Sequence, residues 1–371
     1  MPSLNRRKVA FVLPSFNAGG AERVLITLMN GLDRTRFEPI FIGLQKNGQL
    51  RDLIAPDIPV HTIKNYRGFL RSLPSLLLLL RQAQPDIILS TMAHMNFAVL
   101  LLKLFLPRHI KIIVREAITP SYMFDTMKRG WLVKILYKWL YPKADKVICP
   151  AQIIIDQFRD LVRIDTENFV RLYNPVHIEK IRAAKDLPER EGKSAVRFIC
   201  VGRLHPQKGF DRLIDSLEAR GKDIPFEWTI TILGGGPEEE NLKAQIQKAG
   251  LEKNIFLKGF AKEPWPHIGA ADCLLLPSRF EGLPNVVLES LCAGTPVIAT
   301  KESGGIQEIA SLVPENIVTV VKNMEDFVEA MKNVTPTPTR FYRPSLLPKI
   351  LEPASVLRKL DEILEEKKHH R

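Results

Sequence analysis

The chain has 371 residues, of which 45% are hydrophobic and 25% charged, and its formal net charge is +12. This length suits two domains, and the composition excludes a disordered or fibrous protein. The positive charge favours partners such as nucleic acid, an anionic membrane or phosphorylated substrates. The four cysteines form no C-x-x-C pair, which predicts core residues in a reducing compartment: Cys149, Cys200, Cys273 and Cys292.

The apolar stretches are too short for a signal peptide or a membrane span. Residues 9–13 follow a basic cluster but precede no small-residue cleavage site. The most apolar segments, 76–80 and 97–106, fall short of the roughly 20 residues that a spanning helix needs. We therefore expect a cytoplasmic protein that crosses no membrane.

Short apolar runs alternate with helical patterns in the first half. Strands are predicted at 9–13, 38–44, 60–63, 86–90, 111–115 and 146–149, and helices at 71–82, 96–106 and 151–161. This alternation predicts a parallel sheet covered on both faces, with ligands at the carboxyl ends of its strands. His94 and Glu116 would lie at that edge, although a structural role for His94 is an alternative.

A glycine pair follows the first strand. Gly19 and Gly20 precede a helical pattern, and a strand, a glycine turn and a helix start together can accept a phosphate group. The pair is not G-x-G-x-x-G, so a tight turn that needs positive φ is the alternative.

The segment 127–143 combines aromatic and basic residues. Its aromatic and basic positions recur at helical spacing: Lys128, Arg129, Trp131, Lys134, Lys138 and Trp139. Such a helix suits the headgroup layer of an anionic membrane. Basic and aromatic residues elsewhere in this half point the same way: Lys64, Tyr66, Arg67, Phe69, Arg71 and Lys103. The alternative is a core helix with a solvated basic face.

Two cations follow the first strand of the second half, at 196–201. Arg203 and Lys208 would lie on the loop and the helix start, where a guanidinium and an ammonium group can clamp a diphosphate. The alternative is a pair of exposed charges. The next strand, 229–233, leads into Gly234-Gly235-Gly236, which lacks the third glycine of a dinucleotide fingerprint and argues against NAD.

Further strands are predicted at 255–259, 273–276 and 297–300, and two carboxylates follow the second of them. Glu281 precedes a helix that begins near Pro284 and ends at Gly294, and Glu289 lies inside this otherwise apolar helix. Free N–H groups at a helix start attract anions, so both carboxylates could line one cleft. The alternative is an internal ion pair for Glu289 and a solvated loop for Glu281.

The segment from Glu281 to Glu289 resembles the E-x7-E signature of retaining glycosyltransferases of sequence family 4. The resemblance implies an α/β protein of the GT-B fold, in which two Rossmann-like, doubly wound domains face each other across a cleft. It implies that Glu289 holds the nucleotide ribose and that Glu281 lies by the donor sugar. Other donor contacts would come from Gly19, Gly20, Arg203, Lys208, Gly235, Phe260, Leu283, Pro284 and Asn285.

The resemblance also divides the chain. Residues 1–176 would form the acceptor-binding domain and 177–345 the nucleotide-sugar domain. Residues 346–371 would carry a last helix that crosses back to the first domain. Relatives often place a histidine at the end of the strand 111–115, where this sequence has Arg115-Glu116. Glu116 and His94 are therefore the candidates for the acceptor side.

The hypothesis is retaining transfer of a hexose or N-acetylhexosamine from a UDP-sugar to a lipid-linked glycan, at the inner face of the membrane. The sequence around Glu281 resembles that of the subgroup that builds lipid-linked oligosaccharides, capsules and O-antigens. No D-x-D motif occurs near a strand end, so we expect neither a metal ion nor another cofactor, and Arg203 and Lys208 would stabilise the departing diphosphate. The alternatives are a nucleotide-sugar hydrolase or epimerase and a non-catalytic scaffold subunit. Nucleic-acid binding is not supported, because no known motif is present.

Overall fold

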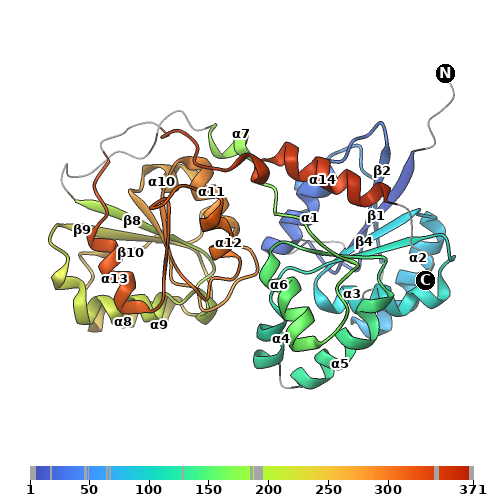
Figure 1. Ribbon diagram of the computed structural model, residues 1–371, viewed down its shortest axis with the longest axis horizontal. Coiled ribbons are helices and arrows are strands. Elements are labelled where there is room, and N and C mark those ends of the chain that lie inside the picture. Colours follow the sequence, from blue (N-terminus) through green and yellow to red (C-terminus); the bar gives the residue numbers. More distant parts are fainter. Residues whose placement is uncertain are drawn as a thin grey trace. The chain divides into compact units, whose positions relative to one another are not determined.

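The computed structural model describes residues 6–16, 19–45, 48, 50–63, 66, 68–127, 129–183, 187, 195–337 and 342–366. The chain forms two compact units (Figure 1). The first comprises Met1–Pro175 with Ala354–Arg371, and the second comprises Val176–Pro353. The sequence placed these boundaries after residues 176 and 345.

The first unit is built on a parallel seven-stranded sheet. Its strand order is β3-β2-β1-β4-β5-β6-β7. The strands are β1 (Arg7–Leu13), β2 (Phe37–Gly43), β3 (Val60–Thr62), β4 (Ile87–Thr91), β5 (Lys111–Arg115), β6 (Lys146–Cys149) and β7 (Phe169–Arg171). The six predicted strands are confirmed, whereas β7 was missed because its three residues are not fully buried. The direction of winding reverses between β1 and β4, which makes their carboxyl ends a topological switch point.

Helices cover both faces of this sheet. One face carries α2 (Leu73–Ala83), α3 (Ala93–Leu102), α5 (Gly130–Leu140) and α6 (Gln152–Gln157), whose apolar residues pack on alternate residues of the strands. The other face carries α1 (Gly20–Asn30) and α14 (Pro353–Glu365) (Figure 1). A short α4 (Pro120–Thr126) precedes α5. Helix α3 begins at Ala93 rather than at the predicted residue 96, so His94 lies in its first turn.

The last helix belongs to the first unit, as the resemblance implied. Lys111, at the start of β5, donates from its Nζ to the carbonyl oxygens of Ile363 at 2.6 Å and Glu366 at 2.7 Å. Arg7 donates to the Leu364 carbonyl at 2.8 Å. These cations satisfy carbonyl groups that the end of a helix leaves unpaired. Burial lowers the pKa of Lys111 to about 8.

The second unit repeats the architecture with a parallel six-stranded sheet. Its order is β10-β9-β8-β11-β12-β13, so its switch point lies between β8 and β11. The strands are β8 (Val196–Val201), β9 (Trp228–Leu233), β10 (Ile255–Leu257), β11 (Cys273–Leu276), β12 (Val297–Thr300) and β13 (Val318–Val321). The sequence missed β13, whose two central residues are only half-buried.

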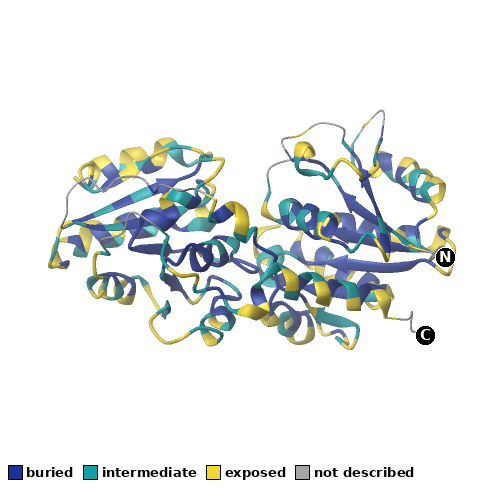
Figure 2. Ribbon diagram, turned by 90° about the horizontal axis from the view of Figure 1, so that it is seen from above, coloured by how far each residue is buried: buried dark blue, intermediate teal, exposed yellow. Residues whose placement is uncertain are grey.

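Two helical layers enclose the second sheet. One layer contains α8 (Phe210–Arg220), α9 (Glu239–Lys248) and α13 (Met324–Lys332), and the other contains α10 (Trp265–Ala270), α11 (Asn285–Ala293) and α12 (Ile306–Ser311). A single helical turn, α7 (Ile178–Ile181), precedes this domain's first strand. Figure 2 shows the central strands of both units as buried and the outer helix faces as exposed. All four cysteines are buried thiols, which confirms their predicted place in the core.

In the part of the chain that the structure describes, no helix has both the length and the apolar character needed to cross a membrane.

Candidate active site

The loops after β8 and β11 meet at the switch point of the second unit. The loop after β8 contains a single 3-10 turn, η6 (Pro206–Lys208), and then Gly209 with φ of 67°. A Cβ at Gly209 would lie 1.9 Å from the carbonyl oxygen of Pro277. Only glycine therefore allows the two loops to approach this closely and keeps Lys208 beside the loop after β11.

Lys208 and Glu281 form the centre of this site. Lys208 Nζ lies 2.6 Å from Glu281 Oε1, and Ser278 Oγ donates to the same oxygen at 2.9 Å. The carboxylate of Glu281 is buried, so the alternative of a solvated loop at this position is wrong. A charge-assisted hydrogen bond satisfies a buried carboxylate that would otherwise be costly.

A second basic residue, Arg212 on α8, holds the loop after β11 through its backbone. Its guanidinium donates to the carbonyl oxygens of Pro277 at 2.8 Å and Ser278 at 2.6 Å, and to Thr300 Oγ1 at 3.0 Å. The sequence interpretation overlooked Arg212 and Ser278. The spacing from Lys208 gave no signal for Arg212, because Lys208 ends the turn η6 and Gly209, with φ of 67°, separates that turn from α8.

The turn after β12 closes the other side of the loop. Gly304 has φ of 62°, and a Cβ there would lie 2.2 Å from the carbonyl oxygen of Glu281. The next residue, Gly305, donates its N–H to the Gly282 carbonyl at 2.8 Å. The backbone that carries Glu281 is therefore held by the segments that follow β8 and β12.

Arg203 differs from Lys208 in having no partner among the residues that the structure describes. It follows β8 by two residues and is exposed, and its side chain makes no hydrogen bond or ion pair within the described ranges. An uncompensated guanidinium at the carboxyl end of a parallel sheet can bind an anionic ligand.

The remaining predicted donor residues surround this edge of the same unit. Glu289 lies on α11, is half-buried, and does have an interaction partner. Pro284 is the residue before α11 rather than its first residue, Leu283 is buried, and Asn285 begins the helix. The helix ends at Gly294 with φ of 80°, as predicted.

Two more predicted positions come together at the ends of β9 and β10. A Cβ built on Gly235 would lie 3.9 Å from the Cβ of Phe260. The Phe260 ring is 69% exposed, so its surface is open to a ligand.

The first unit has its own candidate residues at the carboxyl edge. Gly19 precedes α1 and Gly20 begins it, and a Cβ on Gly19 would collide with the carboxylate of Glu22. Glu22 is buried, and desolvation raises its pKa. His94 is exposed, and its ring meets the edge of Phe69 with centroids 5.2 Å apart. Partial desolvation by its neighbours lowers the pKa of His94.

Glu116 lies in the interior instead. It is 3% exposed, accepts a hydrogen bond from Asn96 Nδ2 at 3.1 Å, and also accepts one from the Tyr141 hydroxyl. Burial raises the pKa of Glu116 to about 8. Its neighbour Arg115 is also buried and donates to Asn174 Oδ1 at 2.5 Å. This placement favours a structural role for Glu116, and leaves His94 as the exposed acceptor-side candidate.

Lys64, Arg67 and Lys128, which the sequence assigned to the membrane-facing surface, lie outside the described residues. Within the described ranges, no group of three or more His, Cys, Asp or Glu side chains could hold a metal ion.

Comparison with known proteins identifies the family of each half. Residues 18–180 match the model of Glycosyltransferase Family 4, and residues 180–338 match that of Glycosyl transferases group 1. A Campylobacter jejuni protein is 26% identical over 346 residues, which cover 88% of this chain and 90% of that protein. It is named N-acetylgalactosamine-N,N'-diacetylbacillosaminyl-diphospho-undecaprenol 4-alpha-N-acetylgalactosaminyltransferase.

Solved structures share the fold over nearly the whole chain. The lipopolysaccharide outer core galactosyltransferase WaaB is 20% identical with a TM-score of 0.72, and the match covers 96% of this chain and 99% of that one. Anabaena Alr3699/HepE, solved in complex with UDP-glucose, is 19% identical with a TM-score of 0.75, covering 97% and 99%. The two doubly wound units are those of the GT-B fold. The chain therefore belongs to the glycosyltransferases, its first half to family 4 and its second half to group 1.

Proposed function

We propose that the protein transfers a hexose or N-acetylhexosamine from a UDP-sugar to a lipid-linked glycan, with retention at the anomeric carbon and without a metal ion. The observation that carries the proposal is the pair of cations after β8. Lys208 lies 2.6 Å from the buried Glu281, and the exposed Arg203 lies on the same loop after β8. This arrangement offers a sugar-binding carboxylate and a diphosphate-binding cation at one sheet edge.

The residues of the second unit would supply the chemistry without a protein nucleophile. The acceptor hydroxyl attacks the anomeric carbon as the bond from that carbon to the phosphate oxygen breaks. The acceptor proton passes to the departing phosphate oxygen on the same face. Arg203 and Lys208 stabilise the charge that develops on the diphosphate, which is commonly the largest catalytic contribution. Glu281 lies by the sugar, and Glu289 holds the ribose hydroxyls.

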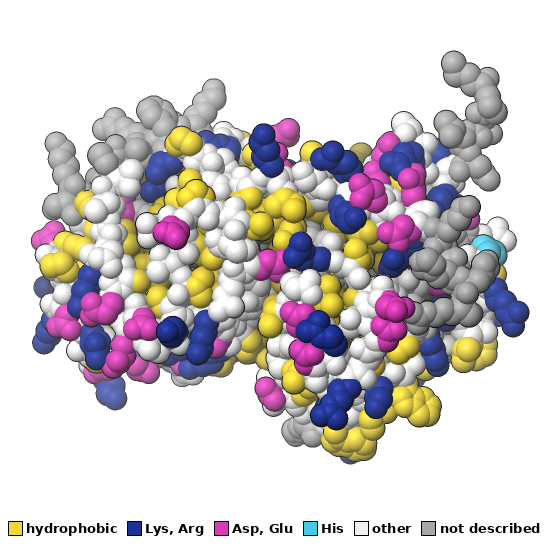
Figure 3. Space-filling model, viewed as in Figure 1, with side chains coloured by type: hydrophobic (Ala, Val, Ile, Leu, Met, Phe, Trp, Pro, Cys, Tyr) yellow, Lys and Arg dark blue, Asp and Glu magenta, His cyan; other side chains and the backbone are white. Residues whose placement is uncertain are grey.

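The proposal of a lipid-linked acceptor is supported by a relative and by a surface of the first unit. The Campylobacter jejuni relative is named for a diphospho-undecaprenol acceptor. On α5 of this chain, Trp131 is 63% exposed and Trp139 is 72% exposed. Exposed cations accompany them: Arg129, Lys134 and Lys138. In Figure 3, hydrophobic and basic side chains gather where Figure 1 places α5.

Two tryptophans directed to solvent among lysines are unfavourable in water but suit the interface of an anionic bilayer. A core helix with a solvated basic face would instead turn its aromatic residues inward. We therefore include reversible docking of α5 on the cytoplasmic leaflet in the proposal. A lipid-linked acceptor is available only at that surface.

The decisive experiment incubates purified protein with a panel of UDP-sugars and a membrane lipid extract, with and without a chelator. The expected product is a lipid-soluble glycoside with the anomeric configuration of the donor, formed equally in both conditions. Free sugar in place of glycoside would identify a hydrolase, and an inverted linkage would contradict retention. Loss of activity with chelator would contradict metal independence.

A further inference from the structure

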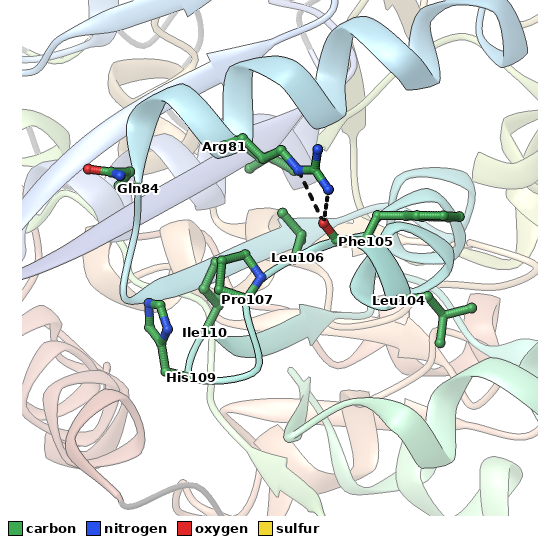
Figure 4. A pocket seen from close by; sticks show the side chains of 9 residues that line it. Arg81, Gln84, Leu104, Phe105, Leu106, Pro107, His109 and Ile110 are labelled. Carbon is green, nitrogen blue, oxygen red and sulfur yellow. Dashed lines mark hydrogen bonds between the residues drawn. The ribbon is translucent and has the colours of Figure 1, made fainter.

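A groove lies at the edge of the first sheet that is opposite His94. It is bounded by the end of α2 and by the segment from η3 (Lys103–Phe105) to β5, and its volume is about 770 Å³ (Figure 4). Buried apolar side chains form its floor: Leu80, Leu106 and Ile110. Its wall is formed by Leu104 and Phe105, which are 76% and 56% exposed. The groove therefore offers an apolar lining that the described chain leaves uncovered.

The rim of the groove is polar and positive. Arg81, Gln84 and His109 line it, and no acidic side chain is among the described residues that do so. Arg81 donates from Nε at 3.2 Å and from Nη2 at 2.7 Å to the Phe105 carbonyl (Figure 4). These bonds hold the guanidinium beside the groove and leave Nη1 for an anionic oxygen. An apolar trough with a fixed guanidinium matches a hydrocarbon chain that carries a phosphate group.

The groove adjoins the surface that we assign to the membrane. Helices α2, α3 and α5 lie side by side on one face of the sheet. Lys103 of η3 donates to the Lys143 carbonyl at 2.6 Å, which joins η3 to the turn that directly follows α5. Leu78 on α2 and Leu101 on α3 are also exposed. The groove, Leu78, Leu101 and Trp139 thus belong to the same helical layer of the first unit.

We propose that this groove takes up one acyl chain of an anionic membrane phospholipid, whose phosphate binds Arg81. The inference rests on the proposed docking of α5, because a bilayer must be adjacent. The acceptor's own diphosphate is not the occupant. The five residues of β5 span about 16 Å at roughly 3.3 Å per residue, so the groove lies that far from the carboxyl edge near His94.

The test is photocrosslinking of the full chain. Anionic vesicles of phosphatidylglycerol and phosphatidylcholine carry a trace of phosphatidylglycerol with a photoreactive group at the end of one acyl chain. After irradiation and trypsin digestion, mass spectrometry should find lipid adducts on residues 104–110. A Leu104→Ser/Phe105→Ser variant should lower this adduct about tenfold, because both apolar walls are lost. Ile350→Ser, at an exposed apolar residue of the second unit, is the matched control and should change nothing.

Competition separates the possible occupants. Unlabelled phosphatidylglycerol should suppress the adduct, phosphatidylcholine should do so less well, and Arg81→Gln should remove this difference. Preferential displacement by a polyprenyl phosphate would overturn the inference in favour of the acceptor lipid. Adducts on α5 with none on residues 104–110 would overturn it while leaving membrane docking intact. Dimerisation of the wild type without lipid, lost in the Leu104→Ser/Phe105→Ser variant, would show instead that a second copy covers the groove.

Discussion

Lys208 Nζ and Glu281 Oε1 lie 2.6 Å apart, although the residues are 73 positions apart in the chain. The exposed fractions of the two side chains are 18% and 10%. Each charge therefore depends on the other, and each is also proposed to meet the donor. When the donor binds, its diphosphate would contact Lys208 and its sugar would contact Glu281 while the two side chains remain paired with each other.

The first prediction concerns the stability of this pair. Lys208→Met should lower the free energy of unfolding by about 2 kcal/mol, because it leaves the Glu281 carboxylate without its cation. Adding Glu281→Gln should recover part of the loss, with a coupling free energy of about 1–2 kcal/mol. Chemical denaturation of the wild type, the two single variants and the double variant measures this coupling free energy. Additive effects would mean that the pair contributes no coupling.

Arg203→Ala should abolish transfer and leave the fold unchanged, because the side chain is exposed and unpaired among the described residues. UDP binding should weaken about 10- to 100-fold, as expected for the loss of charge-assisted hydrogen bonds worth about 1.5–3 kcal/mol. Calorimetry with UDP and thermal melting give the two readouts. The matched control is Arg220→Ala on the same unit, whose exposed guanidinium pairs with Glu325 at 2.7 Å. Normal turnover by folded Arg203→Ala would reject the diphosphate assignment.

Substitutions of Glu281 and Glu289 should have different effects on UDP binding. Glu289→Gln should weaken binding of UDP and of UDP-sugar alike, because it would contact the ribose that both ligands carry. Glu281→Gln should leave UDP affinity nearly unchanged and mainly lower the turnover number, because it would contact the sugar. Calorimetry with UDP alone distinguishes them, and equal losses for both variants would contradict this division.

Glu116 gives a prediction on pH dependence. Its pKa is raised from 4.5 to about 8, so between these values the folded protein binds a proton that the unfolded chain has released. Native stability from this group is therefore present below pH 4.5 and is lost as the pH rises through about 8. Glu116→Gln, which stays neutral, should match the wild type near pH 4.5 and exceed it at pH 8.5 by a few kcal/mol. Denaturation curves across this range test the difference.

The same variant separates structure from catalysis on the acceptor side. If Glu116 is structural, Glu116→Gln should keep its activity, whereas His94→Ala should lose activity without losing stability. A Glu116→Gln protein that is stable but inactive would return Glu116 to the reaction. A fully active His94→Ala protein would remove His94 from it.

Membrane docking predicts that salt and charge control vesicle binding. The wild type should float with anionic vesicles at low salt, since each basic residue contributes about 1 kcal/mol near such a surface. Moderate salt should release it, because charges are screened over about 10 Å at ~0.1 M. A Lys128/Arg129/Lys134→Glu variant should stay in solution. Lys222/Lys248/Lys253→Glu, with the same charge change on exposed positions of the second unit, should float like the wild type. If the Lys128/Arg129/Lys134→Glu variant floats like the wild type, α5 does not dock.

Local patterns in the sequence determined most of the architecture. Near-continuous apolar runs such as 273–276 indicate buried parallel strands without reference to the rest of the chain. A C-terminal cap such as Gly294 depends only on the last turn of its helix. The Glu281–Glu289 spacing is likewise local, so the family could be inferred from it. Strands that are short and partly exposed, such as β7 and β13, lack this signal and were missed.

The tertiary structure alone decided which side chains meet and which face water. Nothing near Glu116 in the sequence shows that its carboxylate turns inward to Asn96 and Tyr141, because those partners come from other elements. The contact between Lys208 and Glu281 likewise depends on two neighbouring strands whose sequence separation is large. The exposure of Trp131 and Trp139 depends on which face of α5 packs on the sheet. Helical spacing identifies the faces of a helix, but only the packing of distant elements determines which of them is buried.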